Sequence, residues 1–186
     1  MVGEADGPED LRDDLVGPAE GLRRAMANFA SGVTIVTAVD DGVQWAMTCN
    51  SFTSISLAPP LVMVSASQHG RFHDRLLSAG RWAVSVLAAG QGDVARHFAD
   101  PDRDRRRQFE PIDHEISAVT GSPMIQGALA WLECQTEQTL TAGDHTLVVG
   151  SVLGAAIHDS ERLPLTYFRG GFLDVPRSAA RPADHR

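Results

Sequence analysis

The most regular feature of the sequence is a pair of long runs rich in Thr, Val and Leu, at residues 130–140 and 146–157. The connection between them contains Gly143, which can adopt the positive φ that a tight hairpin turn requires. Such residues favour extended strands because branched side chains pack well on a pleated surface. The pattern therefore predicts a long antiparallel β-hairpin in the second half of the chain.

Shorter runs of the same character occur elsewhere along the chain. The sequence predicts additional strands at 33–39, 43–49, 61–66, 82–87 and 165–168. Apolar residues recur at helical spacing in three stretches, 20–30, 72–77 and 91–98. Six or more strands with few helices are typical of a closed antiparallel barrel, so we expect a mainly β fold with a few flanking α-helices.

Length and composition fit one domain. A chain of 186 residues with 43% apolar content can bury one sizeable core. Large apolar groups are few at both ends, so we expect a flexible acidic leader over 1–19, a folded domain over 20–175 and a flexible tail over 176–186. No signal-peptide pattern and no run long enough to span a membrane is present, and we expect a cytoplasmic protein with no membrane contact.

The charges weigh against several classes of partner and enzyme. The 24 acidic residues outnumber the 16 basic ones, and the net charge of −8 disfavours nucleic acids and anionic membranes as partners. All the basic residues are arginines, so an anion must be bound by Arg or by backbone N–H groups. This scarcity of basic groups also weighs against an oxidase of the pyridoxamine-phosphate type.

A neutral polar segment follows the predicted strand at 43–49. Its short polar side chains are Thr48, Asn50, Ser51, Thr53, Ser54 and Ser56. No charged residue occurs from Val43 to Gln68, so these groups are neutral hydrogen-bonders suited to an uncharged heteroaromatic ring or to a phosphate. By composition alone, a Ser/Thr-rich strand and loop without a ligand is the better interpretation.

Five sequence blocks, in this order, resemble the flavin reductase family that has the FMN-binding split-barrel fold. The blocks are LRRAMANFASGVTIVTA, AMTCNSFTSISLAPPLVMV, AGRWAVSVLAAGQGDVARHFA, GSPMIQGALAWLECQTEQTLTAGDHTLVVGSV and PLTYFRGGF, and they span residues 22–172. The resemblance implies a Greek-key split β-barrel that binds FMN or FAD, oxidises NADH or NADPH, and supplies reduced flavin to a separate monooxygenase. It also implies a homodimer in which the second subunit completes the flavin site.

The same resemblance implies which residues bind the flavin. The isoalloxazine ring is expected against Gln44, Trp45, Ala46, Met47, Thr48, Asn50 and Ser51. The ribityl chain and phosphate are expected against Ser65, Ala66, Ser67, Gln68, His69, Gly70 and Arg71. Arg71 also suits an anion on physical grounds, because it lies close to the start of a predicted helix.

Two further motifs are implied to lie beside NAD(P)H: Gly143-Asp144-His145 and Tyr167-Phe168-Arg169-Gly170. Without the resemblance, a lone His145 after a turn is more often a hairpin or core hydrogen-bonder than a catalytic group. Arg169 is equally suited to clamping the end of a strand or to binding a dinucleotide phosphate. We therefore expect His145 to position the nicotinamide without acting as an obligatory acid or base.

The function implied is that of an NAD(P)H:flavin oxidoreductase. Hydride passes from nicotinamide to flavin without a protein nucleophile, so the protein need only stack the two rings and exclude water. The alternative is a non-catalytic flavin-binding split-barrel module that acts as a redox sensor or carrier, because a barrel does not fix an activity.

Two other patterns receive the plainer interpretation. His69 and His73 are four residues apart, but only Asp74 offers itself as a third ligand, and we expect no metal site. Residues 100–108 mix Asp and Arg, and we expect a solvated loop or helix there.

Overall fold

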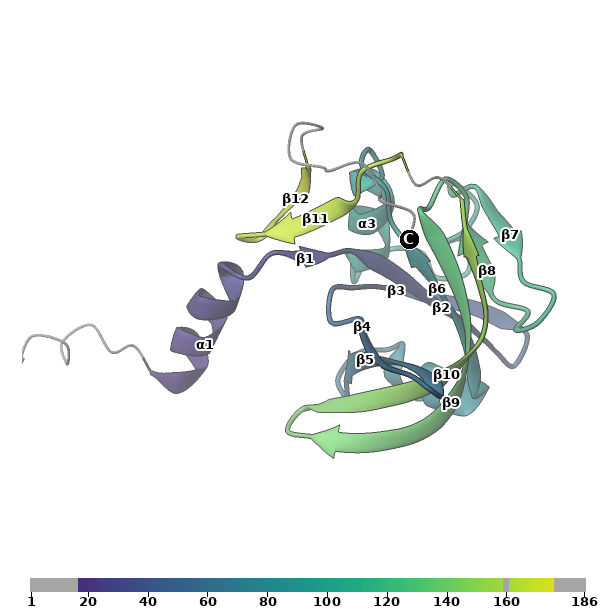
Figure 1. Ribbon diagram of the computed structural model, residues 1–186, viewed down its shortest axis with the longest axis horizontal. Helices are drawn as coiled ribbons and strands as arrows, with labels where there is room; N and C mark the ends of the chain where they lie inside the picture. The colour runs from purple at the N-terminus through teal and green to yellow at the C-terminus, as the bar shows by residue number, and fades with distance from the viewer. Residues whose placement is uncertain (1–16, 159–160, 176–186) are drawn as a thin grey trace, which may run out of the picture.

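The longest elements of the computed structural model, which describes residues 17–158 and 161–175, are β9 (Ala130–Ala142) and β10 (His145–Ile157). They pair antiparallel along their whole length (Figure 1). Gly143, in the turn, has a φ of 63°. The predicted hairpin is confirmed, and its strands approach the turn more closely than the sequence pattern indicated.

This hairpin lies inside a seven-stranded antiparallel sheet with the order β3-β2-β6-β9-β10-β5-β4. The other strands of this sheet are β2 (Thr34–Asp40), β3 (Val43–Cys49), β4 (Thr53–Leu57), β5 (Pro60–Ser67) and β6 (Arg81–Val86). Asp41 and Gly42 both have positive φ and form the two-residue turn between β2 and β3, as their sequence suggests. The predicted strands at 33–39, 43–49, 61–66 and 82–87 are thereby confirmed to within about two residues.

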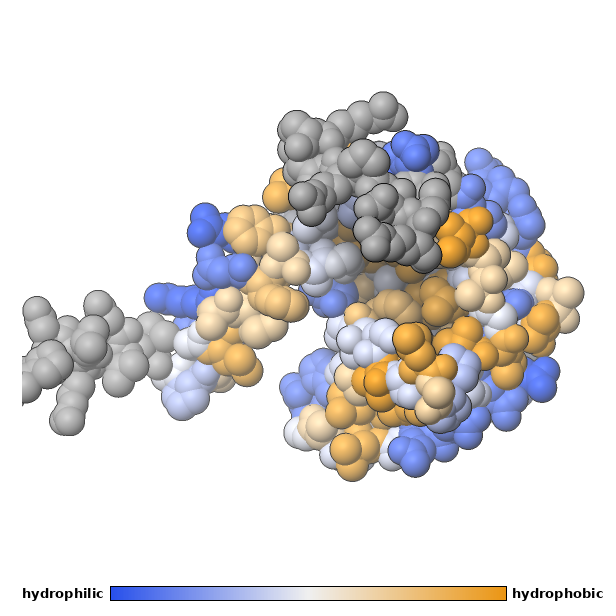
Figure 2. All heavy atoms as spheres, in the orientation of Figure 1, coloured by the Kyte–Doolittle hydropathy of each residue, from blue (hydrophilic) through white to orange (hydrophobic). Residues whose placement is uncertain are grey.

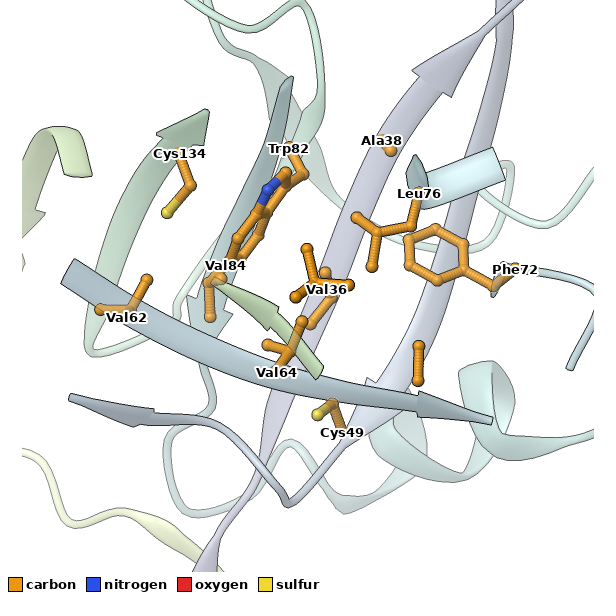
Figure 3. Packing of buried hydrophobic residues seen from close by; sticks show 12 residues of the cluster. Val36, Ala38, Cys49, Val62, Val64, Phe72, Leu76, Trp82, Val84 and Cys134 are labelled. Atoms are coloured by element: carbon orange, nitrogen blue, oxygen red, sulfur yellow. The ribbon is translucent and has the colours of Figure 1, made fainter. Parts of the chain in front are cut away.

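The sheet curves around one apolar core. Figure 3 shows side chains from strands at distant places in the sheet order meeting there, among them Val36 of β2, Val64 of β5 and Trp82 of β6. All three are fully buried. Helix α2 (His73–Ala79) adds Leu76 to the same cluster. A mainly antiparallel β fold with a few helices is confirmed.

The strand order is linear, and β3 and β4, at its two ends, are not paired with each other. A closed ring of backbone hydrogen bonds, which the sequence led us to expect, is therefore not present in the seven-stranded sheet. The hydroxyl of Ser51, in the link between β3 and β4, instead bridges to β5: it accepts a hydrogen bond from Ser65 N and donates one to Ser65 O. Edge strand β3 is left open toward the surface.

A second apolar cluster covers the other face of β2 and β3. Ile35 and Ala46 of these strands pack there with Phe98 of α3 (Gly92–Ala99) and with Phe109. Two small sheets complete the fold: β1 (Ser31–Gly32) with β11 (Leu165–Phe168) and β12 (Gly171–Asp174), and β7 (His114–Ile116) with β8 (Pro123–Ile125). The predicted strand at 165–168 is confirmed.

Helix α1 (Pro18–Ala27) projects away from the sheet (Figure 1). It buries none of its residues, and Leu22 and Met26 are more than half exposed. The helix ends earlier than the predicted 20–30, because the chain extends into β1 at Ser31. Most of the predicted leader and all of the predicted tail lie outside the described residues. None of the helices described is long and apolar enough to cross a membrane.

Candidate functional site

Edge strand β3 borders three hollows in the surface. Residues 42–44 border the first, which we call the outer hollow, with a volume of about 660 Å³. Residues 45–47 border the second, the basic hollow, of about 280 Å³. Asn50 and Ser51, just after β3, border the third, the wide hollow, of about 940 Å³. The three hollows therefore follow one another along β3 and the link after it.

The basic hollow gathers most of the residues expected at the flavin. Its lining includes Trp45, Ala46, Met47, Ala66, Ser67, His69, Gly70 and Arg71. Arg103 and Arg105, from a segment far along the chain, add two more guanidinium groups, and none of the described residues in the lining has a carboxylate side chain. Guanidinium groups bind phosphate in charge-assisted pairs, so this hollow suits an anionic ligand.

Trp45 supplies a second indication that the basic hollow receives a ligand. Its indole nitrogen is buried and has no hydrogen-bond partner among the described residues. The indole N–H can only donate, and leaving a buried donor unpaired costs about 1–3 kcal/mol. A ligand with an acceptor oxygen would remove that cost.

Arg103 holds residues 100–110 against the open edge of β3. Its guanidinium donates to the carbonyl oxygen of Ala46 (2.6 Å), to that of Asp100 (2.8 Å) and to the side-chain oxygen of Gln108 (3.0 Å). Gln108 in turn donates to the carbonyl oxygen of Gln44 at 2.8 Å. Burial lowers the pKa of Arg103 to about 10, so the group remains charged at neutral pH.

The expectation of a solvated segment at 100–108 holds for most of its residues, which are exposed, but it is wrong for Gln108 and for the half-buried Arg103. Gln108 is 2% exposed, and Phe109, which follows it, is also buried. The sequence does not indicate that Arg103 attaches this segment to β3, because Arg103 differs from its exposed neighbours only in its long-range contacts. The sole local signal was the Gln108-Phe109 pair at the end of the charged run.

The side chains of β3 divide between core and hollow. Ala46 is 1% exposed and packs in the second apolar cluster, while its carbonyl oxygen accepts a hydrogen bond from Arg103. The hydroxyl of Thr48 donates to the carbonyl oxygen of Ala95 at 2.7 Å. Among these residues, Trp45 and Met47 line the basic hollow and are partly buried against the first apolar core. A ligand bound along β3 would therefore contact the backbone of the strand as well as its side chains.

The wide hollow lies between α1, β1, β11 and the link that follows β3, and Figure 2 shows the surface recessed beside α1. Asn50, Ser51, Tyr167, Arg169 and Gly170 all border it. The Ser51–Ser65 hydrogen bonds separate it from the basic hollow, whose lining resumes at Ala66. The residues expected at the flavin ring are therefore divided: Gln44 borders the outer hollow, residues 45–47 border the basic hollow, and Asn50 and Ser51 border the wide hollow. The described residues expected at the phosphate that border a hollow all border the basic one.

Ser31 is a residue of the wide hollow that the sequence did not single out. It is paired with Tyr167 in the β1–β11 ladder, and its hydroxyl oxygen is buried without a hydrogen-bond partner among the described residues. The helix predicted at 20–30 ends next to this position, and no sequence pattern indicates a ligand there. A polar ligand in the wide hollow would satisfy this hydroxyl.

Arg169 serves as a clamp between β11 and α1. Two nitrogens of its guanidinium donate to the side-chain oxygen of Asn28 at 3.1 and 3.0 Å, and its backbone N–H donates to the carbonyl oxygen of Ala27. The guanidinium also lies 5.0 Å from the ring centre of Phe168. The contacts of Arg169 are therefore those of a clamp at the end of a strand. The residue also borders the wide hollow.

His145 lies elsewhere, at the start of β10 and opposite Ser67 of β5. Its Nδ1 is 2.7 Å from a carboxylate oxygen of Asp144, a hydrogen bond that lowers the pKa of Asp144. Gln68 fastens this turn by donating to the carbonyl oxygens of Asp144 and His145. His145 borders none of the three hollows, and the turn and β11 lie on different sides of the molecule in Figure 1. One chain therefore does not bring the two nicotinamide motifs into a common hollow.

His73 is occupied within the fold. Its Nδ1 is 2.7 Å from Asp74, and its Nε2 is 2.8 Å from the hydroxyl of Thr146. Across residues 17–158 and 161–175, no group of three or more His, Cys, Asp and Glu side chains could hold a metal ion.

Comparisons of sequence and of structure both find flavin reductases as the proteins similar to this chain. The family model described as "Flavin reductase like domain" matches residues 26–176. An "NADH-dependent FAD reductase" of Streptomyces globisporus is 43% identical over 145 residues, which are 76% of this chain and 79% of that protein. The match to a "Probable flavin reductase" of Rhizobium meliloti, 40% identical over 161 residues, covers 86% of this chain but only 50% of that protein.

Two solved structures have the same fold. One is the Streptomyces globisporus NADH:FAD oxidoreductase SgcE6 in complex with NAD and FAD fragments, with a TM-score of 0.82 and 39% identity over 90% of this chain and 99% of that one. The other is BorF, the flavin reductase component of a bacterial two-component tryptophan halogenase, with a TM-score of 0.80 and 43% identity over 85% of this chain and 98% of that one. The chain belongs to the flavin reductase like family.

Proposed function

We propose that this protein is an NAD(P)H:flavin oxidoreductase, which transfers hydride from NADH or NADPH to FMN or FAD and supplies the reduced flavin to a separate monooxygenase. The observation that carries the proposal is the pair of adjoining hollows at the end of β3, each with a buried, unpartnered polar atom: the Ser31 hydroxyl in one and the Trp45 indole nitrogen in the other. A planar heteroaromatic ring attached to a phosphate fits this combination.

The isoalloxazine ring occupies the wide hollow in this proposal, next to Asn50 and Ser51, and the flavin phosphate occupies the basic hollow near Arg71. The hydroxyl of Ser51 is already engaged with Ser65, so Ser51 contributes mainly its backbone and fixes the link between the hollows. The large apolar walls of the wide hollow, including Met26 and Phe29 of the α1 region, exclude water from the rings.

When bound, the flavin supplies the ring that accepts the hydride. The protein's residues have only to hold the two rings in contact, because correct placement alone accounts for a large part of the rate. Tyr167 borders the wide hollow and lies opposite Ser31, a position from which the two side chains can orient a nicotinamide against the flavin. No protein group needs to gain or lose a proton in that step.

The proposed assembly is a homodimer of split barrels. Open strand edges and a sheet wrapped around one core support the split barrel. The exposed apolar side chains of α1 and the separation of His145 from Tyr167 support a second subunit that covers the wide hollow. Static light scattering of the purified chain would show a dimer mass, and a monomer at micromolar concentration would contradict this assembly.

The activity is tested by mixing the purified protein with NADH or NADPH and with FMN or FAD, and following absorbance at the nicotinamide band. We expect flavin-dependent loss of absorbance with at least one of the four pairs. Flavin binding without such loss in all four would support the non-catalytic module instead.

Replacing His145 with Ala tests the nicotinamide role of the β9–β10 turn. We expect KM for NAD(P)H to rise about tenfold, the usual effect of losing one good polar contact, with little change in KM for flavin. Steady-state kinetics with each substrate varied in turn measures both values. Unchanged KM for NAD(P)H would show that His145 only shapes the turn with Asp144.

A further inference from the structure

Residues 67–73, which we call the connecting loop, run from the last residue of β5 to the first residue of α2. All of them except Gln68 belong to the lining of the basic hollow. In the proposed reaction this hollow receives the flavin phosphate, and Arg71 of the connecting loop lies beside it. The connecting loop is therefore the part of the chain that serves the flavin end of the reaction.

The connecting loop is also bound to the β9–β10 turn, which carries His145. Ser67 lies opposite His145 in the β5–β10 ladder. The backbone N–H of Gln68 donates to the carbonyl oxygen of Asp144 at 2.9 Å, and its side-chain amide donates to the carbonyl oxygen of His145 at 3.2 Å. Gln68 and Asp144 are exposed, so water competes for both of these bonds.

His73 makes the shielded bond between the same two elements. Its Nε2 is 2.8 Å from the hydroxyl of Thr146, the residue that directly follows His145. Thr146 is 5% exposed and the His73 side chain 12%. Its Nδ1 is 2.7 Å from the Asp74 carboxylate, which accepts from an N–H and leaves Nε2 of the neutral ring to accept from the Thr146 hydroxyl. A hydrogen bond screened from water in this way holds its partners more firmly than an exposed one.

The connecting loop has little freedom to adjust one end without moving the other. The N–H of Gly70 donates to the carbonyl oxygen of Ser67 at 2.9 Å, and a Cβ at position 70 would come within 3.0 Å of that oxygen, so the turn is tight. Phe72 and Leu76 then anchor the end of the loop and the start of α2 in the first apolar core (Figure 3). A displacement at the Thr146 end is therefore passed to the residues of the basic hollow.

The order Asp74, His73, Thr146 also has the form of an acid, base and nucleophile series. Thr146 is buried and borders none of the three hollows, so its hydroxyl does not meet a substrate. The arrangement fits a structural connection and not a nucleophile.

We propose that His73 is a positioning residue for both substrates: through Thr146 it holds the connecting loop, which binds the flavin phosphate, against the end of β10 that presents His145 to NAD(P)H. This inference rests on the proposed flavin reductase function and on the roles given there to the basic hollow and to His145. His73 acts through the loop and not on the reacting rings. Loss of this single bond should weaken both substrates together.

The first test removes the hydroxyl and keeps the shape of the side chain, in Thr146→Val. KM for flavin and KM for NAD(P)H should both rise about fivefold, the effect of losing one hydrogen bond, while kcat changes less than about twofold. Thr146→Ser keeps the hydroxyl and should restore both KM values. The matched control is Thr139→Val, the same substitution at an exposed position of β9 that borders none of the three hollows.

A second pair of variants makes the test independent of packing around Thr146. The amide of a glutamine at position 73 reaches as far as Nε2 and can still accept from Thr146, whereas the amide of an asparagine reaches only as far as Nδ1. His73→Asn should therefore raise both KM values as Thr146→Val does, and His73→Gln should raise them less. Steady-state kinetics with each substrate varied in turn gives the KM values, and urea unfolding shows that each variant is folded.

Three results would overturn the inference. A rise in only one of the two KM values in Thr146→Val and His73→Asn would show that the bond serves one substrate. Unchanged KM values for both substrates would show that it serves neither. A lower kcat with both KM values unchanged is the mark of fewer folded molecules, and would show that His73 only stabilises the fold.

The same variants separate this inference from the proposed function. If the wild type reduces no flavin, the proposed function fails. Equilibrium dialysis of FMN and of NAD+ against the wild type, Thr146→Val and His73→Asn then measures whether the one bond supports both binding sites. Equal binding of both compounds by all three proteins would overturn the inference on its own.

Discussion

Two peripheral regions flank the candidate site, and an arginine attaches each of them to the body of the protein. Residues 100–110 are attached to β3 by Arg103, which donates to three acceptors and lies over the ring of Phe98 at 5.7 Å. Helix α1 is attached to β11 by Arg169, whose side chain donates to Asn28 alone among the described residues. The first arginine is half-buried and the second is exposed.

The difference shows which walls of the site one chain can build alone. The segment at 100–110 buries Gln108 and Phe109, so the basic and outer hollows have a fixed wall before any ligand arrives. Helix α1 buries nothing, so its side of the wide hollow has little to hold it except the Arg169 clamp. We therefore expect the basic hollow to be rigid and the wide hollow to depend on a ligand or a second subunit.

The largest effect is expected from Arg103→Met, which keeps the side-chain length and removes the guanidinium. The variant leaves the Ala46 carbonyl and the Gln108 side chain without their donor, and we expect the free energy of unfolding to fall by about 2 kcal/mol. Urea unfolding measures the loss, with the exposed Arg96→Met as control. Wild-type stability together with wild-type flavin affinity would show that Arg103 does not hold the wall of the basic hollow.

A smaller and more local effect is expected from Arg169→Ala. Global stability should change by about 1 kcal/mol or less, because an exposed polar contact contributes little. Trypsin should nevertheless cleave after Arg23 and Arg24 several-fold faster, since α1 loses its attachment. Asn28→Ala removes the same bond from the other side, and a double variant that cleaves much faster than either single one would argue against the clamp.

The smallest effect concerns the ion pair of Asp40 with Arg75, 2.9 Å apart, behind the basic hollow. The hydrogen bond from Arg75, helped by one from Ser78, lowers the pKa of Asp40 below its ordinary 3.8. The folded state therefore favours the carboxylate, so the stabilisation is complete above that ordinary value and is lost as the pH falls through the lower folded value. Asp40→Asn should have a lower free energy of unfolding than the wild type at pH 7. The difference between the two proteins should become smaller below about pH 4.

Urea unfolding of both proteins from pH 3 to pH 7 measures this difference in the free energy of unfolding. Arg75 also lies 5.1 Å from the ring centre of Trp45, so the variant should change Trp45 fluorescence at neutral pH. A stability difference independent of pH would show that the Asp40 carboxylate is not what Arg75 holds.

Local patterns were enough for much of the fold. The β9–β10 and β2–β3 hairpins were predictable because their turns contain Gly143 and Gly42 next to runs of strand-forming residues. Short strands such as β7 and β8 were not, because three residues carry no periodic signal. β8 is also held by residues distant in the sequence, through hydrogen bonds with Thr37 and Ser85.

The candidate site divides in the same way. The neutral polar segment after β3 and the residues around Arg71 were expected at one ligand, and the structure gathers them in two adjoining hollows. The roles of Ser31 and Arg103 were not predictable, because an unpartnered hydroxyl and a clamping guanidinium are defined by what surrounds them.

The sequence by itself determined the strand-rich fold, the family and the types of group available to a ligand, because these follow from local periodicity and from ordered motifs. Tertiary structure alone decided that Ala46 turns its methyl into the core and that His145 lies away from Tyr167. It also decided that a charged run becomes a wall of the site. The physical reason is that strand register and long-range hydrogen bonds choose which face of each residue meets the ligand, and a sequence pattern does not specify that face.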